Sequence, residues 1–177
     1  MADPIATLAD GLQLRFAERA DTEFVLQFIR ELADYERLAS EVVADEALLE
    51  KWLFGERPVA EVILAERHGD AVGFALFFHN FSTFLGRPGI YIEDIYVRPG
   101  ARGTGVGKAL LTYVSRIAVD RGCGRLEWSV LDWNEPAIAF YERLGAVPMD
   151  EWTVYRVTGE PLIELAQSFP GSEGDHQ

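Results

Sequence analysis

Cysteine is nearly absent from this chain of 177 residues, in which Cys123 stands alone. A single cysteine cannot close a disulfide within the chain, so we expect a protein of a reducing compartment, the cytoplasm. Histidine is also scarce, with 3 widely spaced residues, which argues against a metal site built from His and Cys. The sequence lacks both the ~20-residue apolar run of a membrane helix and the basic, then apolar start of a signal peptide. We therefore expect no membrane association.

Basic residues are in short supply as well, with 16 Lys and Arg against 29 Asp and Glu, which gives a formal charge of −13. No basic stripe interrupts this acidic balance, so nucleic acid is not an expected partner. The acidity favours cationic or neutral partners, although solubility alone also explains such a charge. Apolar residues make up 49% of the chain, which is enough for a sizeable core, and the length suits one domain.

The two ends of the chain differ in composition from the rest. Residues 1–11 and 167–177 are polar or rich in Gly and Pro, and we expect both ends to be flexible. Residues 12–166 contain no linker, repeat or low-complexity tract, so they are predicted to form a single domain. Strand and helix patterns alternate along it. The expected strands are 12–16, 59–66, 71–78, 90–97, 126–131 and 152–157, and the expected helices are 21–35, 45–52, 106–122, 134–145 and, shorter, 161–166.

Local turn and cap signals support this order of elements. The residues His68, Gly69 and Asp70 are typical of a hairpin turn between two strands. Asp21, Asp45 and Asn134 stand where a side chain can cap the start of a helix. Hairpins mixed with crossovers favour an α/β or α+β fold with a sheet of mixed direction over a doubly wound sheet.

The most specific local signal is a glycine-rich loop at residues 98–108 (RPGARGTGVGK), between an expected buried strand and the longest expected helix. Its glycines at 103, 105 and 107 allow the backbone to approach a ligand closely, and the start of the helix presents unpaired N–H groups. Arg102 and Lys108 add positive charge at the same place. The loop is therefore predicted to bind an anion such as a diphosphate.

Three other interpretations of the loop compete with this one. A P-loop fails at two of its four defining positions, where Arg102 and Ala109 stand. A dinucleotide fingerprint needs a glycine where Lys108 stands. Glycines that serve only the turn itself are the third alternative.

The second signal is an acidic pair, Glu93 and Asp94, within an otherwise apolar strand. Neighbouring residues of a strand face opposite sides, so without a bulge at least one carboxylate points to an interior face. Burying an unpaired carboxylate is costly. One interpretation is that one carboxylate pairs with a basic residue and the other lies at the end of the strand. The alternative is that the pair is functional. Amine chemistry needs both a base and an ammonium-binding carboxylate.

Two motifs together carry a family resemblance. Residues 102–107 (RGTGVG) resemble the Arg/Gln-x-x-Gly-x-Gly/Ala signature of the GNAT N-acetyltransferase superfamily, and residues 133–146 (WNEPAIAFYERLGA) resemble its second cofactor motif. The resemblance covers about residues 12–166. It implies the GNAT fold, a mixed and mostly antiparallel sheet of about six or seven strands flanked by about four helices. It also implies acetyl-CoA as the cosubstrate and no metal.

The same resemblance assigns roles to individual residues. Tyr141 stands at the position of the general acid that protonates the departing thiolate, although a Phe-Tyr pair on such a helix is ordinarily part of a core. Glu93 would take the proton of the amine through a bound water, and a backbone N–H near Val97 would stabilise the oxyanion. The cofactor-binding residues would be Ile95, Tyr96, Val97, Arg102, Gly103, Thr104, Gly105, Val106, Gly107, Lys108, Asn134, Pro136, Ala137 and Tyr141.

Three further segments resemble the diamine, or spermidine/spermine, N-acetyltransferase branch: residues 31–36 (ELADYE), 91–97 (YIEDIYV) and 133–136 (WNEP). This branch implies a small cationic acceptor of the diamine or polyamine kind and a homodimeric enzyme. Tyr35 and Glu36 equally suit the solvated end of an amphipathic helix. The loop 80–89 departs from the family pattern, which leaves the amine open. The acceptor-binding residues would be Tyr35, Glu36, Glu93, Asp94, Glu127, Trp128 and Ser129.

The sequence thus predicts direct transfer of acetyl from acetyl-CoA to a primary amine, and alternatives stay open. One is the same chemistry on another amine, such as thialysine, an amino acid, an aminoglycoside or a protein N-terminus. A second is a catalytically silent module that binds acyl-CoA. A third is an unrelated nucleotide-binding domain.

Overall fold

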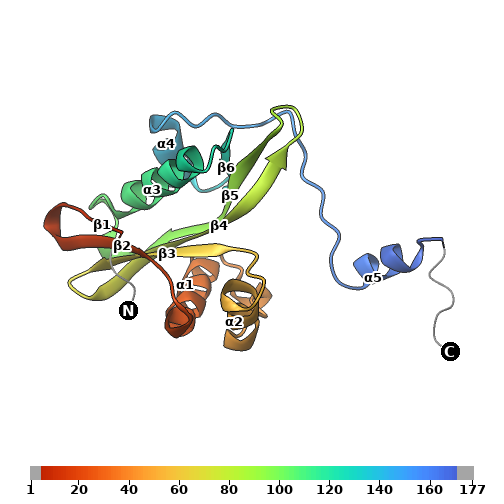
Figure 1. The fold of residues 1–177 in the computed structure, drawn as a ribbon, viewed down its shortest axis with the longest axis horizontal. Coiled ribbons are helices and arrows are strands. Elements are labelled where there is room, and N and C mark those ends of the chain that lie inside the picture. Colours follow the sequence, from red (N-terminus) through yellow and green to blue (C-terminus); the bar gives the residue numbers. More distant parts are fainter. Residues whose placement is uncertain (1–4, 171–177) are drawn as a thin grey trace. The chain divides into compact units, whose positions relative to one another are not determined.

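A computed structural model describes residues 5–170 of the chain (Figure 1). These residues form two compact units, the first ending at Ser129 and the second beginning at Val130. The first unit contains a six-stranded sheet whose strands follow one another in chain order. The strands are β1 (Ala6–Thr7), β2 (Leu12–Phe16), β3 (Glu61–Arg67), β4 (Asp70–Ser82), β5 (Arg87–Val97) and β6 (Leu126–Trp128).

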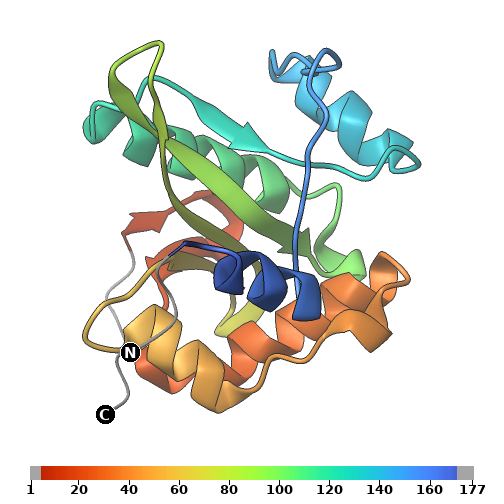
Figure 2. The same ribbon diagram turned by 90° about the vertical axis from the view of Figure 1, so that its right-hand side faces the viewer.

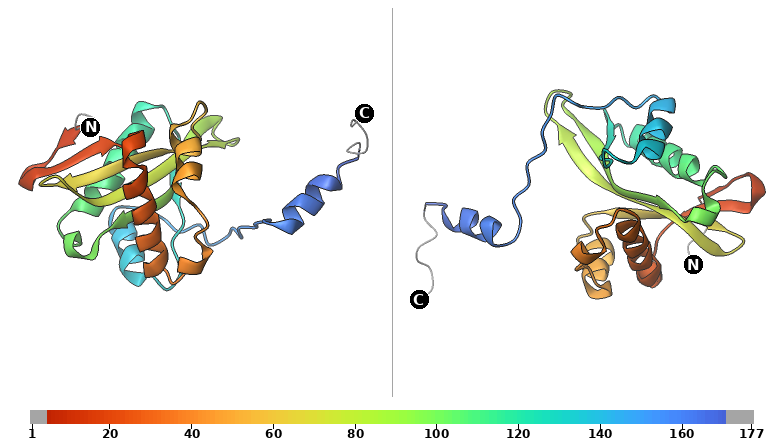
Figure 3. Two further views of the ribbon diagram at one scale, coloured as in Figure 1. Left: turned by 90° about the horizontal axis from the view of Figure 1, so that it is seen from below. Right: turned by 180° about the vertical axis from the view of Figure 1, so that it is seen from behind.

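All neighbouring strands of this sheet are antiparallel except β5 and β6, which are parallel. Parallel neighbours need a crossover connection, and α3 (Val106–Asp120) supplies it. Two helices, α1 (Thr22–Tyr35) and α2 (Glu46–Phe54), lie side by side on one face of the sheet, and α3 lies on the other (Figure 1 and Figure 3). The predicted sheet of mixed, mostly antiparallel direction is confirmed.

In the first unit the sheet lies between α3 and the layer of α1 and α2 (Figure 2). Buried apolar side chains of the core lie on both faces of this sheet. Phe28 of α1 is fully buried, and its ring stacks on Phe74 of β4 with the centroids 5.3 Å apart. On the other face, α3 buries residues spaced three or four apart, as its apolar periodicity predicts. These residues are Val106, Leu110, Leu111, Val114, Ile117 and Ala118.

The predicted hairpin turn joins β3 and β4. Only His68 and Gly69 separate the two strands, and their φ angles are +55° and +89°. A two-residue turn with both φ values positive matches the right-handed twist of the strands that it connects. Glycine adopts this conformation without strain, and histidine does so at a modest cost.

Two of the three predicted helix caps are confirmed. The Asp45 carboxylate accepts a hydrogen bond from the Leu48 N–H at 2.8 Å, and the Asn134 side chain accepts one from the Ala137 N–H at 3.4 Å. Asp21 stands at the start of α1, but its side chain caps none of the amides of that helix. That prediction is wrong.

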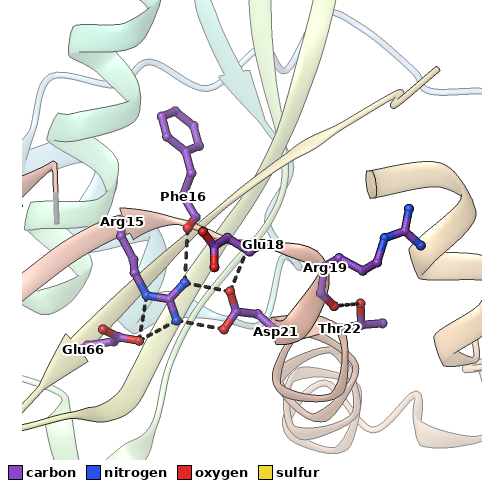
Figure 4. Close-up of polar contacts among 7 residues, drawn as sticks. All are labelled: Arg15, Phe16, Glu18, Arg19, Asp21, Thr22 and Glu66. Carbon is purple, nitrogen blue, oxygen red and sulfur yellow. Dashed lines mark hydrogen bonds and ion pairs between the residues drawn. The ribbon is translucent and has the colours of Figure 1, made fainter. Parts of the chain in front are cut away.

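The Asp21 carboxylate binds Arg15 instead (Figure 4). The Arg15 Nη1 and Nη2 atoms donate to the two Asp21 oxygens at 2.6 and 2.8 Å, and Nη2 also donates to Glu66 at 2.7 Å. Arg15 and Asp21 are buried, and a buried guanidinium requires neutralising partners. Asp21 therefore serves the interior of the fold rather than the helix end.

Within its described residues, 130–170, the second unit contains two helices, α4 (Glu135–Arg143) and α5 (Glu160–Gln167). The strand predicted over residues 152–157 does not form among the described residues, and Trp152, Val154 and Tyr155 are exposed there. An alternating apolar pattern favours a strand, but a strand forms only where a second backbone supplies its hydrogen bonds. The prediction is therefore wrong for this segment.

The N-terminal residues also differ from expectation. Ala6 and Thr7 lie in the stretch predicted to be flexible, yet they pair with Leu14 and Gln13 of β2 and add a short edge strand to the sheet. Residues 9–11 form a short 3-10 turn (Ala9–Gly11), and Gln167 is the last residue of a helix, so these parts of the predicted flexible ends also have regular structure. Residues 1–4 and 171–177 lie outside the described residues. None of the helices in the described range combines the length and the apolarity needed to cross a bilayer.

Candidate functional site

The glycine loop between β5 and α3 has the backbone conformation of an anion cradle. Gly103 and Gly105 have φ angles of +74° and +89°, a left-handed conformation that favours glycine. Gly105 is the N-cap of α3, and no side chain caps the helix there. The first hydrogen bond of this turn runs from the Ala109 N–H to the Gly105 carbonyl at 2.9 Å, so the preceding amides lack an intrahelical acceptor. The start of α3 therefore presents N–H groups and the positive end of the helix dipole.

Arg102 and Lys108, the two cations predicted to bind the diphosphate, have different surroundings. Lys108 is exposed on the first turn of α3, where it lines a groove of about 790 Å³ together with Thr104 and Gly105. Arg102 turns toward α1 instead: its guanidinium lies 4.6 Å from the centroid of the Tyr35 ring, and its Nε donates to the Val97 carbonyl at 2.9 Å. Lys108 therefore lines the groove beside Gly105, whereas Arg102 lies against Tyr35.

A β-bulge separates the two members of the acidic pair. Leu76 of β4 lies opposite Asp94, and Phe77 lies opposite Ile92, so Glu93 has no partner across the ladder. A bulge breaks the strict alternation of faces, which removes the need for one carboxylate to point inward. Glu93 is exposed and Asp94 is half-buried.

Glu36, Glu93 and Asp94 together form what we term the acidic cluster. Burial raises the pKa of Asp94 from its ordinary value of 3.8 to about 6, and the charges of Glu93 and Glu36 add to the rise. Burial also raises the pKa of Glu36, which directly follows α1. The ion pairs of the described residues include none of these three carboxylates. The cluster therefore carries negative charge that no basic side chain balances there.

The sheet opens beside the acidic cluster. β5 and β6 pair only from Ile90 to Ile92, whereas β5 continues to Val97. The Arg98 N–H bonds to the Val72 carbonyl on the β4 side, so the N–H of Val97, one residue earlier, faces the opposite edge. Within the first unit, the end of β5 thus has backbone groups that no described strand uses.

The predicted acceptor residues on and after β6 already have partners. Glu127 accepts a hydrogen bond from Asn80 at 2.7 Å and pairs with Arg125 at 2.8 Å. The Ser129 hydroxyl is 2.7 Å from the Tyr91 hydroxyl. Trp128 pairs with Ile92 in the ladder. Glu127 is thus neutralised, unlike the carboxylates of the acidic cluster.

The remaining predicted residues belong to the second unit. Asn134 is buried and caps α4, and Pro136 and Ala137 lie in the first turn of that helix. Tyr141 is half-buried, and its ring centroid is 5.4 Å from that of Phe140. The other main elements of the predicted site lie in the first unit: the glycine loop, the end of α1 and the acidic pair.

Arg98 is a residue of this region that sequence reasoning missed. Its guanidinium donates to both Glu31 oxygens, from Nε at 3.0 Å and from Nη2 at 2.8 Å, and lies 4.7 Å from the centroid of the Phe28 ring. Tyr96 is buried with its ring 5.6 Å from Arg102. No local signal pairs Arg98 with Glu31, because the two residues are 67 positions apart in the chain and belong to different elements.

Comparison with known proteins agrees with this geometry. The model of the acetyltransferase (GNAT) family matches residues 25–146. The chain is 41% identical to a thialysine N-epsilon-acetyltransferase of Bos taurus, over 88% of this chain and 97% of that protein. It is 29% identical to a human spermidine/spermine N(1)-acetyltransferase-like protein 1, over 90% of this chain and 24% of that protein.

Among solved structures, an integron cassette protein from the mobile metagenome of V. cholerae resembles this one with a TM-score of 0.75 and 28% identity. The match covers 89% of this chain and 98% of that one. In the described residues, no group of three or more His, Cys, Asp or Glu side chains is arranged to hold a metal ion. The fold, the glycine loop and these matches agree, and the chain belongs to the acetyltransferase (GNAT) family as an N-acetyltransferase.

Proposed function

We propose that this N-acetyltransferase moves the acetyl group of acetyl-CoA onto the terminal primary amine of a small cationic acceptor. The observation that carries the proposal is the acidic cluster. Burial among like charges raises the pKa of Asp94 to about 6. An ammonium group beside Asp94 would relieve this repulsion and compensate for the lost solvation. A cationic acceptor is therefore the ligand that the cluster suits.

GNAT enzymes use acetyl-CoA, and the glycine loop suits its diphosphate. The uncapped start of α3 and the left-handed glycines leave backbone amides available to phosphate oxygens. The backbone of residues 103–107 and the Lys108 side chain would hold the diphosphate. Residues 95–97 of β5 would contact the pantetheine arm. The sequence resemblance separately assigns Asn134, Pro136 and Ala137 of α4 to cofactor binding. When bound, acetyl-CoA supplies a thioester that a neutral amine can attack.

The acceptor must lose a proton before it can attack, because an ammonium group has no free electron pair. Glu93 is exposed at the bulge and open to solvent, so it would accept this proton through a bound water. Asp94 would stay ionised beside the second cationic group of the acceptor and hold the molecule in place. The Val97 N–H, which faces away from β4, would donate to the oxyanion that develops on the thioester carbonyl.

Tyr141 of α4 is the proposed general acid. A phenol is protonated at neutral pH and can donate its proton to the departing thiolate. The partly exposed ring of Tyr141 supports this role over that of a core aromatic, because a core side chain would be fully buried. By this scheme the amine attacks the thioester directly, and no covalent intermediate forms on the enzyme.

The proposed acceptors fall into two groups that share a terminal amine and a second cationic group. Thialysine is one, supported by the name of the bovine relative. Diamines and polyamines are the other, supported by the sequence resemblance and by the name of the human relative. The higher identity favours thialysine as the first acceptor to test. The resemblance further supports a homodimer, which light scattering of the purified protein would test. The single cysteine supports a reducing compartment, the cytoplasm, which cell fractionation would test.

Release of CoA thiol from acetyl-CoA, measured in the presence of thialysine, lysine, putrescine, spermidine or spermine, tests the proposal. We expect at least one of these amines to raise the rate well above that of acetyl-CoA hydrolysis alone. If none does while calorimetry detects acetyl-CoA binding, the protein is a silent binding module and the proposal fails. Tyr141→Phe supplies a second test, with turnover expected to fall about 10²-fold while acetyl-CoA binding is kept.

A further inference from the structure

Two arginines at the start of the glycine loop hold one side of α1. Arg98 binds the Glu31 carboxylate with two nitrogens, at 3.0 and 2.8 Å. Arg102 lies over the Tyr35 ring, 4.6 Å from its centroid. Glu31 and Tyr35 are four residues apart and therefore share a face of the helix. The loop thus contacts α1 at two successive turns, the second of which is the last turn of the helix.

The Arg102 side chain is fixed from the sheet side as well. Its Nε donates to the Val97 carbonyl at the end of β5, and its guanidinium also lies 5.6 Å from the centroid of the buried Tyr96 ring. A guanidinium can stack on an aromatic face and donate hydrogen bonds in its own plane at the same time, whereas an ammonium group cannot. Arg102 therefore joins the end of α1 to the end of β5.

These contacts assign the side chain a task other than phosphate binding. We propose that Arg102 is a positioning residue for the acceptor: by stacking on Tyr35 it holds the end of α1, and with it Glu36, against the acidic pair of β5. The diphosphate is left to the backbone amides of the loop and to Lys108. The inference rests on the proposed function for the identity of the acceptor site, and it gives the Arg102 side chain a different role from the cofactor binding that the resemblance implies.

Arg102→Ala separates the two roles. If the side chain positions the acceptor, the KM for the amine rises about 2- to 10-fold, while the Kd of acetyl-CoA, measured by calorimetry without amine, changes less than about twofold. A side chain that binds phosphate predicts the reverse, and a tenfold weaker acetyl-CoA affinity with an unchanged amine KM would overturn the proposal. Equal losses in both constants, or no change in either, would overturn it too.

Variants of Tyr35 test whether the coupling passes through its ring. Tyr35→Phe keeps the aromatic face, so it is expected to raise the amine KM less than Tyr35→Leu does. Tyr35→Leu removes the face and is expected to match Arg102→Ala. The double variant that combines Tyr35→Leu with Arg102→Ala should be no worse than the more severe single variant. Independent, additive effects would show that the two residues do not act together.

Hydrogen exchange tests the proposal without any acetyl transfer. In the free protein, the amides of residues 33–38 should exchange faster in Arg102→Ala than in the wild type. Arg121→Ala is the matched control, because Arg121 binds Glu61 at 2.8 Å from the far end of α3 and should leave these amides unchanged. Unaltered exchange in Arg102→Ala would overturn the inference. A wild type that acetylates no amine would instead overturn the proposed function and leave this exchange result standing.

Discussion

Glu93 and Asp94 are neighbours in the chain, yet Asp94 lies opposite Leu76 in the ladder between β4 and β5, whereas Glu93 occupies the bulge without a partner. The bulge gives two adjacent carboxylates different surroundings, because Glu93 is exposed and Asp94 is half-buried. Different surroundings allow different tasks. We assign proton acceptance to the solvated Glu93 and ammonium binding to Asp94, and the predictions below test these assignments and the fold that supports them.

Asp94→Asn is expected to stabilise the protein at neutral pH. The pKa of Asp94 is raised from 3.8 to about 6 in the folded chain, so the folded state binds this proton more tightly than the unfolded state. Stability therefore falls as the pH rises from about 4 to about 6. The asparagine variant avoids this loss, which is on the order of 3 kcal/mol. Thermal unfolding should show a higher Tm for the variant at pH 7 and no difference near pH 4, and a lower Tm at pH 7 would contradict the account.

Glu93→Gln should lower kcat for the amine about 10²-fold, because glutamine cannot accept a proton. The acetyl-CoA Kd and the Tm should change little, since Glu93 is exposed and unpaired across the ladder. Glu61→Gln is a suitable control, because Glu61 lies on β3 and pairs with Arg121 at the end of α3. Stopped assays at saturating amine measure both variants, and a Glu93→Gln enzyme with wild-type kcat would rule out the residue as the base.

Gly105→Ala should destabilise the protein and weaken acetyl-CoA binding. Gly105 has a φ of +89° at the N-cap of α3, and an L residue in this conformation costs about 1–2 kcal/mol. Gly100→Ala is the matched control in the same loop, because an added Cβ would meet no atom within 4 Å and φ is not positive there. Denaturant unfolding and calorimetry compare the two. Equal effects would mean that the left-handed turn does not set the geometry of the loop.

Asp21→Ala should destabilise the fold by about 3–5 kcal/mol, because it leaves the buried Arg15 guanidinium short of a partner. The Arg15 guanidinium holds the pKa of Asp21 below its ordinary value, so this stabilisation is present at neutral pH and is lost in acid. Glu50→Gln breaks the exposed pair with Arg19 and should cost less than about 1 kcal/mol. Urea unfolding at pH 7 measures the free energy of unfolding of both variants. Similar losses of stability in the two variants would contradict the claim that the buried ion pair contributes more than the exposed one.

Features that depend on residues close together in the chain could be predicted from the sequence. The apolar face of α3, the His68-Gly69 turn and the Asp45 cap follow from local spacing and side-chain chemistry. The glycine loop belongs to the same class, because its conformation is set by Gly103 and Gly105 themselves. The part of the candidate site that could be predicted in this way is the glycine loop.

Features set by distant partners could not be predicted. The bulge at Glu93 depends on the register of β5 against β4, and the role of Asp21 depends on the burial of Arg15 beside Glu66, 51 residues away in the chain. The direction of the Arg102 side chain depends on Tyr35, which comes from another element. The sequence shows which residues carry charge, but it does not show which distant residues their side chains contact.

The most direct test of the central claim is to incubate the purified protein with acetyl-CoA and thialysine or spermidine and to identify the product by mass spectrometry. The account predicts a single acetyl group on a terminal amine of at least one acceptor, formed in step with thiol release and lost together with it in Glu93→Gln. Acetyl-CoA that is bound but never transferred to any cationic amine would contradict the account.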